Sequence, residues 1–130
     1  DHLKKEYNLD LTDFYKQGVS WLVAAHEISY IRPAAYNEQV SVMSAIIKLE
    51  PGSLLVEMLM MNEDHTHLKS LMWTRFIHVN VKSGKREKHT DTFMDFARSI
   101  EVNEVDLEKG YQYRLKEIIE NIKQGKIPKP

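Results

Sequence analysis

The most constraining feature of this sequence is a series of four long, strand-like runs separated by short turn signals. The runs cover residues 19–32, 38–50, 53–62 and 67–82. Pro33 closes the first run, because proline cannot donate to a strand ladder. Pro51-Gly52 and Ser83-Gly84 are turn dipeptides, and a polar tetrapeptide separates the third run from the fourth. Long runs joined by such short turns predict an antiparallel meander.

Apolar residues occupy both alternating sets of positions within these runs. Seven of the eight residues from 54 to 61 are apolar, and Glu57 is the exception. Successive strand residues point to opposite faces of a sheet, so both faces are expected to be covered. One helix covers one face. We therefore expect a partner subunit on the other.

Helices are predicted both before and after the four runs in the sequence. Residues 1–7 read as helix, with a further helical turn before Gly18. Thr90 or Asp91 is suited to cap a short helix that ends near residue 100. The last helix is predicted over residues 106–124, with Gly125 as its stop. Its apolar residues form one stripe, made up of Leu107, Tyr111, Leu115, Ile118 and Ile122.

Composition narrows the classes of function. A chain of 130 residues fits one domain, which we divide into a core over 1–103 and a helical extension over 104–125. The absence of cysteine excludes disulfides and zinc–thiolate sites in this sequence and is typical of a cytoplasmic protein. A net charge of -1 gives no basic excess for binding nucleic acid. No apolar run has the length of a membrane span, so a membrane partner is not expected.

The order and spacing of these features resemble the 4-hydroxybenzoyl-CoA thioesterase branch of the hotdog-fold acyl-CoA thioesterase superfamily. The resemblance covers about residues 1–100 and is carried by Y-I-R-P-A at 30–34, by N-E at 37–38 and by S-G-K-R at 83–86. It implies an α+β hotdog fold, in which an antiparallel sheet wraps around a central helix, here extended by a C-terminal helix. The family's first strand and the start of its central helix are expected upstream of Asp1. A homodimer or tetramer is implied as well.

The resemblance also implies an activity, the hydrolysis of an acyl-CoA thioester to a free carboxylic acid and CoA. The family's catalytic aspartate is expected upstream of Asp1, so no catalytic residue is assigned within these 130 residues. Water and a carboxylate suffice for this chemistry, and no cofactor or metal is implied. Two departures from the family pattern flank the basic turn, which we define as residues 83–88. Asn80 stands where aspartate is frequent, and His89 or a neighbour replaces the usual proline.

Two groups of residues are candidates for binding the substrate. Basic side chains at strand ends can hold the phosphates of CoA, arginine through a bidentate fork; the candidates are Arg32, Lys85, Arg86 and Lys88. A charged run is also typical of a solvated turn, and Arg32 has Glu38 as an alternative partner. Apolar, adaptable side chains can line an acyl pocket; the candidates are Tyr30, Met58, Met60 and Trp73. Each of these is also a candidate for plain core packing.

The sequence is also compatible with other functions. One is a noncatalytic hotdog module that binds acyl-CoA or an acyl carrier protein. Another is a cone-shaped α+β binding domain of the kind found in small cyclases and dehydratases. His65 and His67 have the spacing of two metal ligands on a strand, but no third ligand is evident close by. The sequence contains neither a G-x-S-x-G elbow nor a nucleotide-binding glycine motif.

Overall fold

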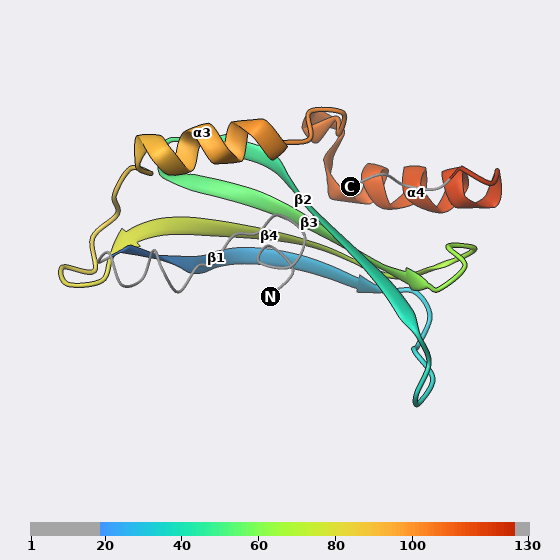
Figure 1. Ribbon diagram of the computed structural model, residues 1–130. Coiled ribbons are helices and arrows are strands. Elements are labelled where there is room, and N and C mark those ends of the chain that lie inside the picture. Colours follow the sequence, from blue (N-terminus) through green and yellow to red (C-terminus); the bar gives the residue numbers. More distant parts are fainter. Residues whose placement is uncertain (1–18, 127–130) are drawn as a thin grey trace.

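The computed structural model describes residues 19–126 and consists of one antiparallel sheet with helices packed on it (Figure 1). The strands are β1 (Val19–Tyr30), β2 (Val40–Glu50), β3 (Ser53–Asn62) and β4 (Leu68–Asn80). The helical elements that follow them are α3 (Asp91–Ile100), the 3-10 helix η1 (Leu107–Lys109) and α4 (Gly110–Lys123). These elements confirm the predicted α+β class. The helix expected over residues 1–7 lies outside the described residues.

The strands lie in the order β1-β4-β3-β2, so β1 and β2 are the edges of the four-stranded sheet that the structure describes. Every neighbouring pair is antiparallel, but β1 pairs with β4 and not with β2. The predicted meander is therefore confirmed for β2, β3 and β4 and is wrong for β1. The strands are slightly shorter than the predicted runs. The chain leaves the ladder at Ile31 and at Val81, and the Glu38 N–H bonds to the carbonyl of Ala35 in a turn before β2 begins.

A shift of register explains part of the missing alternation. In β2 the pairing with β3 moves by one residue between Ile46 and Lys48. A bulge of this kind changes which face the following side chains occupy. Ile47 belongs to a buried cluster on one face, and Lys48 pairs with Leu55 of that same face. Sequence periodicity therefore fails locally where an extra residue has been inserted.

One face of the sheet, which we call the inner face, is covered by α3. Leu54 and Val56 of β3 pack there with Phe93 and Ala97 of α3 in a buried cluster. The Thr90 hydroxyl accepts a hydrogen bond of 3.1 Å from the backbone N–H of Phe93. This bond satisfies a donor that the first helical turn leaves free, so Thr90 is the N-cap.

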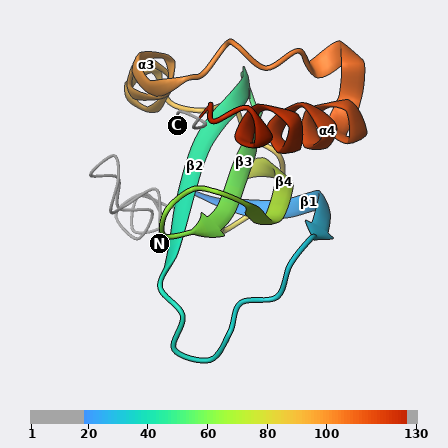
Figure 2. The same ribbon diagram turned by 90° about the vertical axis from the view of Figure 1, so that its right-hand side faces the viewer.

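The opposite face, the outer face, is covered by α4, and Figure 2 shows the two helices on either side of β2 and β3. The predicted stripe is confirmed, because Tyr111, Ile118 and Ile122 are buried against strand residues that include Leu59 and Leu71. At this end of the sheet the chain's own helix therefore occupies the face for which a partner subunit was expected.

A buried ion pair fastens α4 to the sheet. Arg114 donates from Nε and Nη2 to the two carboxylate oxygens of Glu57, each over 2.9 Å. The Trp73 indole N–H donates to Glu57 Oε2, also over 2.9 Å. The Arg114 and Glu57 side chains are only 15% and 5% exposed. The single charged residue in the apolar run of β3 is thus fully paired, as a buried charge requires.

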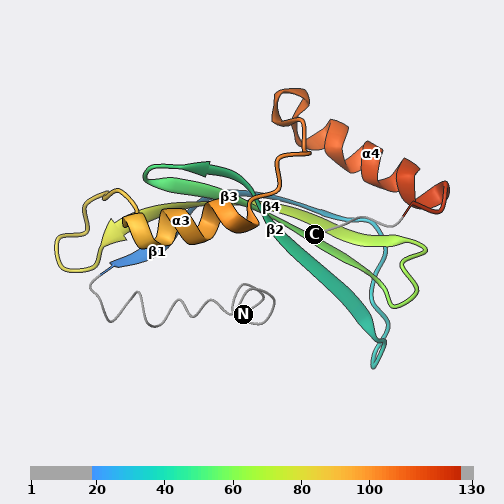
Figure 3. The ribbon, with the colours of Figure 1, turned by 45° about the horizontal axis from the view of Figure 1, so that its top comes forward.

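The last helix begins later than predicted. Gly110 has a φ of 85°, a backbone conformation that favours glycine, and it separates η1 from α4. The continuous helix expected over 106–124 is therefore wrong over its first turn. Figure 3 shows α3 and α4 lying toward different ends of the sheet. None of the described helices is long and apolar enough to cross a membrane.

Candidate functional site

A pocket of about 480 Å³ lies where β1 ends and the chain turns toward β2. Tyr30, Ser70 and Met60 are direct partners across β1, β4 and β3, so their side chains share the inner face. The rest of the wall comes from the loop that follows β1 and from β4. Three predicted site residues, Tyr30, Met60 and Arg32, line this single pocket. The pocket combines apolar walls with one guanidinium.

Arg32 has no ion-pair partner among the described residues. The alternative partner suggested by sequence, Glu38, is bound instead by Lys69, with Nζ 2.8 Å from Glu38 Oε2 and 3.0 Å from Oε1. The hydrogen bond from Lys69 is the main cause that lowers the pKa of Glu38 below its usual value. Glu38 is thus paired with Lys69 and not with Arg32.

Sequence reasoning missed Lys69, which also lines the pocket. Its side chain is 5% exposed, although it stands in a strand between His67 and Ser70 and resembles a surface lysine in the sequence. The partner that explains its burial, Glu38, lies 31 residues earlier in the chain. No local sequence signal predicts a pair so distant.

The predicted acyl residues divide between the two faces. Met58 pairs with Met72 one row further along the inner face from Met60. Trp73 points to the outer face, where its ring meets the Tyr111 ring edge-on at 5.4 Å between centroids. Trp73 is therefore not brought together with Tyr30, Met58 and Met60. The reason is the strand period of two, which sends neighbours to opposite faces.

The basic turn after β4 forms a second candidate region, of about 320 Å³, which Arg86 and Lys88 line together with residues of the β2–β3 turn. The amide of Asn80 organises this turn, because its Oδ1 accepts from the N–H groups of Lys82 and Ser83 at 2.9 and 3.1 Å. Asn80 thus provides a carbonyl oxygen where the resemblance suggested a carboxylate. Among the described residues, neither Lys85 nor the other two basic candidates of the turn has an ion-pair partner.

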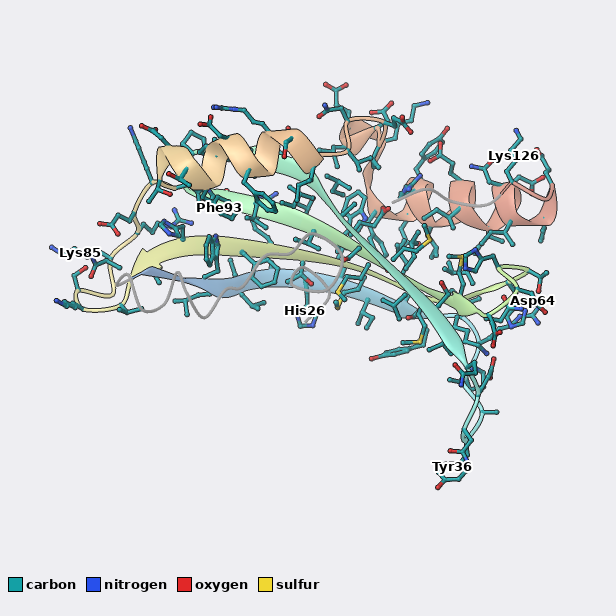
Figure 4. All side chains as sticks on the ribbon, viewed as in Figure 1. His26, Tyr36, Asp64, Lys85, Phe93 and Lys126 are labelled. Carbon is teal, nitrogen blue, oxygen red and sulfur yellow. The ribbon has the colours of Figure 1, made fainter. Side chains whose placement is uncertain are left out.

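The two candidate regions lie at opposite ends of the sheet. Figure 4 shows Lys85 at one end and Tyr36, at the tip of the loop that carries Arg32, at the other. Tyr36 is 95% exposed. Within one chain, therefore, the structure brings Arg32 to the pocket but leaves the basic turn apart from it.

Next to the basic turn, two buried histidines form an aromatic cluster on the inner face with Trp21 and Phe93. The Trp21 indole donates to His89 Nε2 over 3.1 Å, so His89 Nδ1 carries the proton and donates to the Glu50 carbonyl at 3.1 Å. Burial, together with the neighbouring His78, lowers the pKa of His89 to about 4. His89 is therefore a neutral packing residue at the position where the resemblance suggested proline.

The carboxylates of the described strands all face away from the pocket. Glu27 and Glu57 are both direct partners of Trp73, and Glu50 bonds to Arg75 at 2.8 Å on the same outer face. His26 pairs with Thr74 instead, on the inner face, and is exposed. The residues that the structure describes thus supply a pocket, and no carboxylate of the described strands faces it.

One histidine of the β3–β4 turn, His65, makes an ordinary polar contact. His65 Nε2 lies 2.8 Å from Ser41 Oγ. Within residues 19–126, no group of three or more side chains is arranged to hold a metal ion.

Comparison with known proteins finds similarity at the level of fold. No protein-family model and no curated protein matches this sequence. Among solved structures, a 1,4-dihydroxy-2-naphthoyl-CoA thioesterase from Synechocystis has a TM-score of 0.65 at 11% identity, covering 73% of this chain and 70% of that one. The probable thioesterase YbaW from Escherichia coli has a TM-score of 0.63 at 15% identity, over 75% and 74%.

A third similar structure contains a ligand. The hypothetical protein SAV2348 from Staphylococcus aureus, solved in complex with CoA, has a TM-score of 0.67 at 12% identity, covering 84% of this chain and 71% of that one. The four-stranded antiparallel sheet with a C-terminal helix matches the structures from Synechocystis and Escherichia coli. This chain therefore has the hotdog fold that the named thioesterases share.

Proposed function

We propose that this protein binds acyl-CoA thioesters and hydrolyses them to a free carboxylic acid and CoA. The observation that carries the proposal is the pocket at the end of β1, where the Arg32 guanidinium, without an ion-pair partner among residues 19–126, stands beside apolar walls. A thioester of CoA has the matching parts, an apolar acyl group and a phosphorylated carrier. The fold likeness to thioesterases, one from Synechocystis and one from Escherichia coli, supports the same reading.

The acyl group is assigned to the inner face. Met60 and Tyr30 line the pocket, and Met58 continues the apolar surface one row further along the strands. Methionine side chains adapt to irregular apolar shapes, which suits a thioester binding surface. Trp73 is left out of the proposed pocket because it packs under α4 on the other face.

The CoA phosphates are assigned to Arg32 and to the basic turn. Within the part of the chain that the structure describes, these arginine and lysine side chains have no ion-pair partner, and their donors suit phosphate oxygens. The two groups lie at opposite ends of one chain, so a single copy does not present them together (Figure 4).

A second copy of the chain would unite them. Strand β1 is an edge of the described sheet, and its side chains include the exposed Leu22, Val23 and Ile28. Antiparallel pairing of β1 with β1 of another copy around a two-fold axis would place the Arg32 loop of one subunit near the basic turn of its partner. Such pairing would also protect an edge that is otherwise open to aggregation. We therefore propose a homodimer, or a tetramer built from it.

A noncatalytic role in binding acyl-CoA or an acyl carrier protein is the second candidate. The observation that favours it is the orientation of Glu27, Glu50 and Glu57, all of which face the outer side. Hydrolysis needs a group that activates water or attacks the thioester. The proposal assigns substrate binding, and no chemical step, to the described residues.

Release of thiol from a panel of acyl-CoAs by the full-length protein is the test. The panel includes 1,4-dihydroxy-2-naphthoyl-CoA, the substrate named for the Synechocystis structure. Replacing Lys85, Arg86 and Lys88 together by alanine is expected to raise KM about tenfold or more at low salt, because charge-assisted bonds contribute roughly 1.5–3 kcal/mol each. The matched control replaces three exposed lysines of η1 and α4, at positions 109, 116 and 123, and is expected to leave KM unchanged.

Each outcome separates the two candidates. Turnover with a raised KM in the basic-turn variant supports a thioesterase. Binding of acyl-CoA without turnover on any substrate supports the noncatalytic module and contradicts the hydrolase.

A further inference from the structure

Lys69 holds a charge inside the protein at the wall of the candidate pocket. Its ammonium group contacts the carbonyl of Pro33 at 3.1 Å and both carboxylate oxygens of Glu38 at 3.0 and 2.8 Å. An ammonium has three donors, and these three acceptors satisfy them. Burial of such a charge is costly unless it is paired and fully hydrogen-bonded, and here it is.

The same residue holds the loop through its backbone. The carbonyl of Lys69 accepts from the N–H of Ile31 at 2.7 Å and from that of Arg32 at 3.2 Å. Its side chain meanwhile binds the far arm of the loop through Glu38, which also accepts from the Ala35 N–H at 2.8 Å. One residue of β4 thus fastens both arms of the loop over residues 31–38.

Arg32 is the residue that this arrangement leaves free. Its neighbours in the loop are fixed from both sides, yet among described residues its guanidinium has no ion-pair partner. In the sequence, Glu38 is the carboxylate suggested as a partner for Arg32. Because Lys69 binds Glu38, that carboxylate does not pair with Arg32. The Lys69–Glu38 pair therefore both fixes the backbone of Arg32 and keeps its side chain available.

We propose that Lys69 is a positioning residue, which holds Arg32 in place to bind the phosphate groups of a CoA thioester. This inference rests on the CoA recognition in the proposed function. It identifies the contacts that order the Arg32 loop before CoA binds. Lys69 does not bind the ligand itself, because its three donors already have acceptors. A loop ordered before binding avoids the entropy cost of ordering it on binding, and it therefore increases affinity.

The experiment measures binding of CoA and of pantetheine, which lacks the phosphates, to the full-length protein by titration calorimetry. Lys69→Met is expected to weaken CoA binding about tenfold, the loss of roughly one charge-assisted hydrogen bond, and to change pantetheine binding less than about twofold. Arg32→Met is expected to give the same selective loss. The double variant should lose little more than either single one, since both act on one interaction.

Two further variants test whether the loss of binding is specific to the Lys69–Glu38 pair. Glu38→Gln keeps the size of the side chain and one carbonyl acceptor, and it is expected to show a smaller loss of CoA binding in a folded protein. Lys48→Met makes the same substitution at an exposed lysine of the outer face and is expected to leave binding unchanged. Circular dichroism of each variant checks that it is folded.

The outcomes are distinguishable. Equal losses for CoA and pantetheine, or additive losses in the double variant, would overturn the positioning role of Lys69. A selective loss in Arg32→Met with none in Lys69→Met and Glu38→Gln would overturn it as well while leaving Arg32 as a phosphate ligand. No binding of CoA by the unaltered protein would overturn the inference together with the CoA recognition on which it rests.

Discussion

The two faces of the sheet bury polar groups in opposite ways. On the outer face, Glu57 and Arg114 are buried as a charged pair, with both guanidinium–carboxylate bonds at 2.9 Å. On the inner face, His78 and His89 are buried beside Trp21. His78 Nδ1 lies 3.0 Å from the Glu87 carbonyl, and the neutral His89 is bonded to the Trp21 indole and the Glu50 carbonyl. The same four strands therefore bury a charged pair beneath α4, in addition to its apolar stripe, and two imidazoles beside α3.

The two helix–sheet interfaces therefore depend on different properties. A buried ion pair is sensitive to the loss of either partner, because the remaining charge has no solvent and no counter-charge. The buried neutral imidazole of His89 is sensitive to protonation, because burial disfavours its charged form. Truncation should thus weaken the outer face most, and acid should weaken the inner face first.

We expect the largest loss of stability when one partner of the outer-face ion pair is removed. Arg114→Met leaves Glu57 buried without its counter-charge, so we expect the free energy of unfolding to fall by about 3–5 kcal/mol. Urea denaturation at pH 7 measures it. The double variant Glu57→Leu with Arg114→Met removes both charges and should recover a large part of that loss, since apolar residues can replace a buried pair.

The control for this prediction is Arg98→Met on α3. Arg98 pairs with Asp95 at 3.7 Å, and their side chains are 64% and 81% exposed. An exposed pair of this kind contributes about 0–1 kcal/mol. If Arg114→Met were no more damaging than Arg98→Met, the outer face would not depend on charge and the comparison would be wrong.

The next effect concerns acid and the inner face. The pKa of His89 is lowered to about 4 in the folded protein, against 6.5 for a free histidine. Between these values the unfolded chain binds more protons, so the stability present above pH 6.5 is lost as pH falls toward 4. We expect a decrease of roughly 1–2 kcal/mol in the free energy of unfolding between pH 7 and pH 5.

The pH dependence is assigned by comparing variants. His89→Phe loses the bond from Trp21 and should be less stable at pH 7, yet its stability should change less between pH 7 and pH 5. His26→Gln alters an exposed histidine of the inner face and should keep the original slope. An unchanged slope in His89→Phe would show that another group carries the acid sensitivity.

The sequence predicted the helices and strands better than it predicted the side-chain pairs that join them. β2 and β3 ended where their turn signals predicted, and β1 and β4 ended slightly earlier, because these signals act on the local backbone. The stripe of α4 was found for the same reason, since its period of 3.6 is a property of one helix. Gly110 was missed as a break because a glycine inside a helical pattern is often tolerated, and only its φ of 85° shows otherwise.

The candidate site was predictable only in part. The Y-I-R-P-A segment placed Tyr30 and Arg32 together because they are close in the chain. The Lys69–Glu38 pair spans 31 residues, and the Arg114–Glu57 pair spans 57. Contacts at such separations depend on strand order and register, which local patterns do not contain. Trp73 was assigned to the acyl pocket for its residue type, whereas its position one residue from Met72 puts it on the other face.

The smallest effect we predict is at the N-terminus of α3, where the inner helix begins. Thr90→Ala removes the hydroxyl that accepts from the Phe93 N–H and is expected to lower the free energy of unfolding by about 1 kcal/mol. Thr92→Ala, at an exposed position of the same helix, should be neutral or slightly stabilising because alanine has the higher helix propensity. Thermal unfolding of both variants at pH 7 measures the difference. Equal effects of the two would mean that α3 is held by its packing against Leu54 and Val56 alone, and the cap would then add nothing to the inner face.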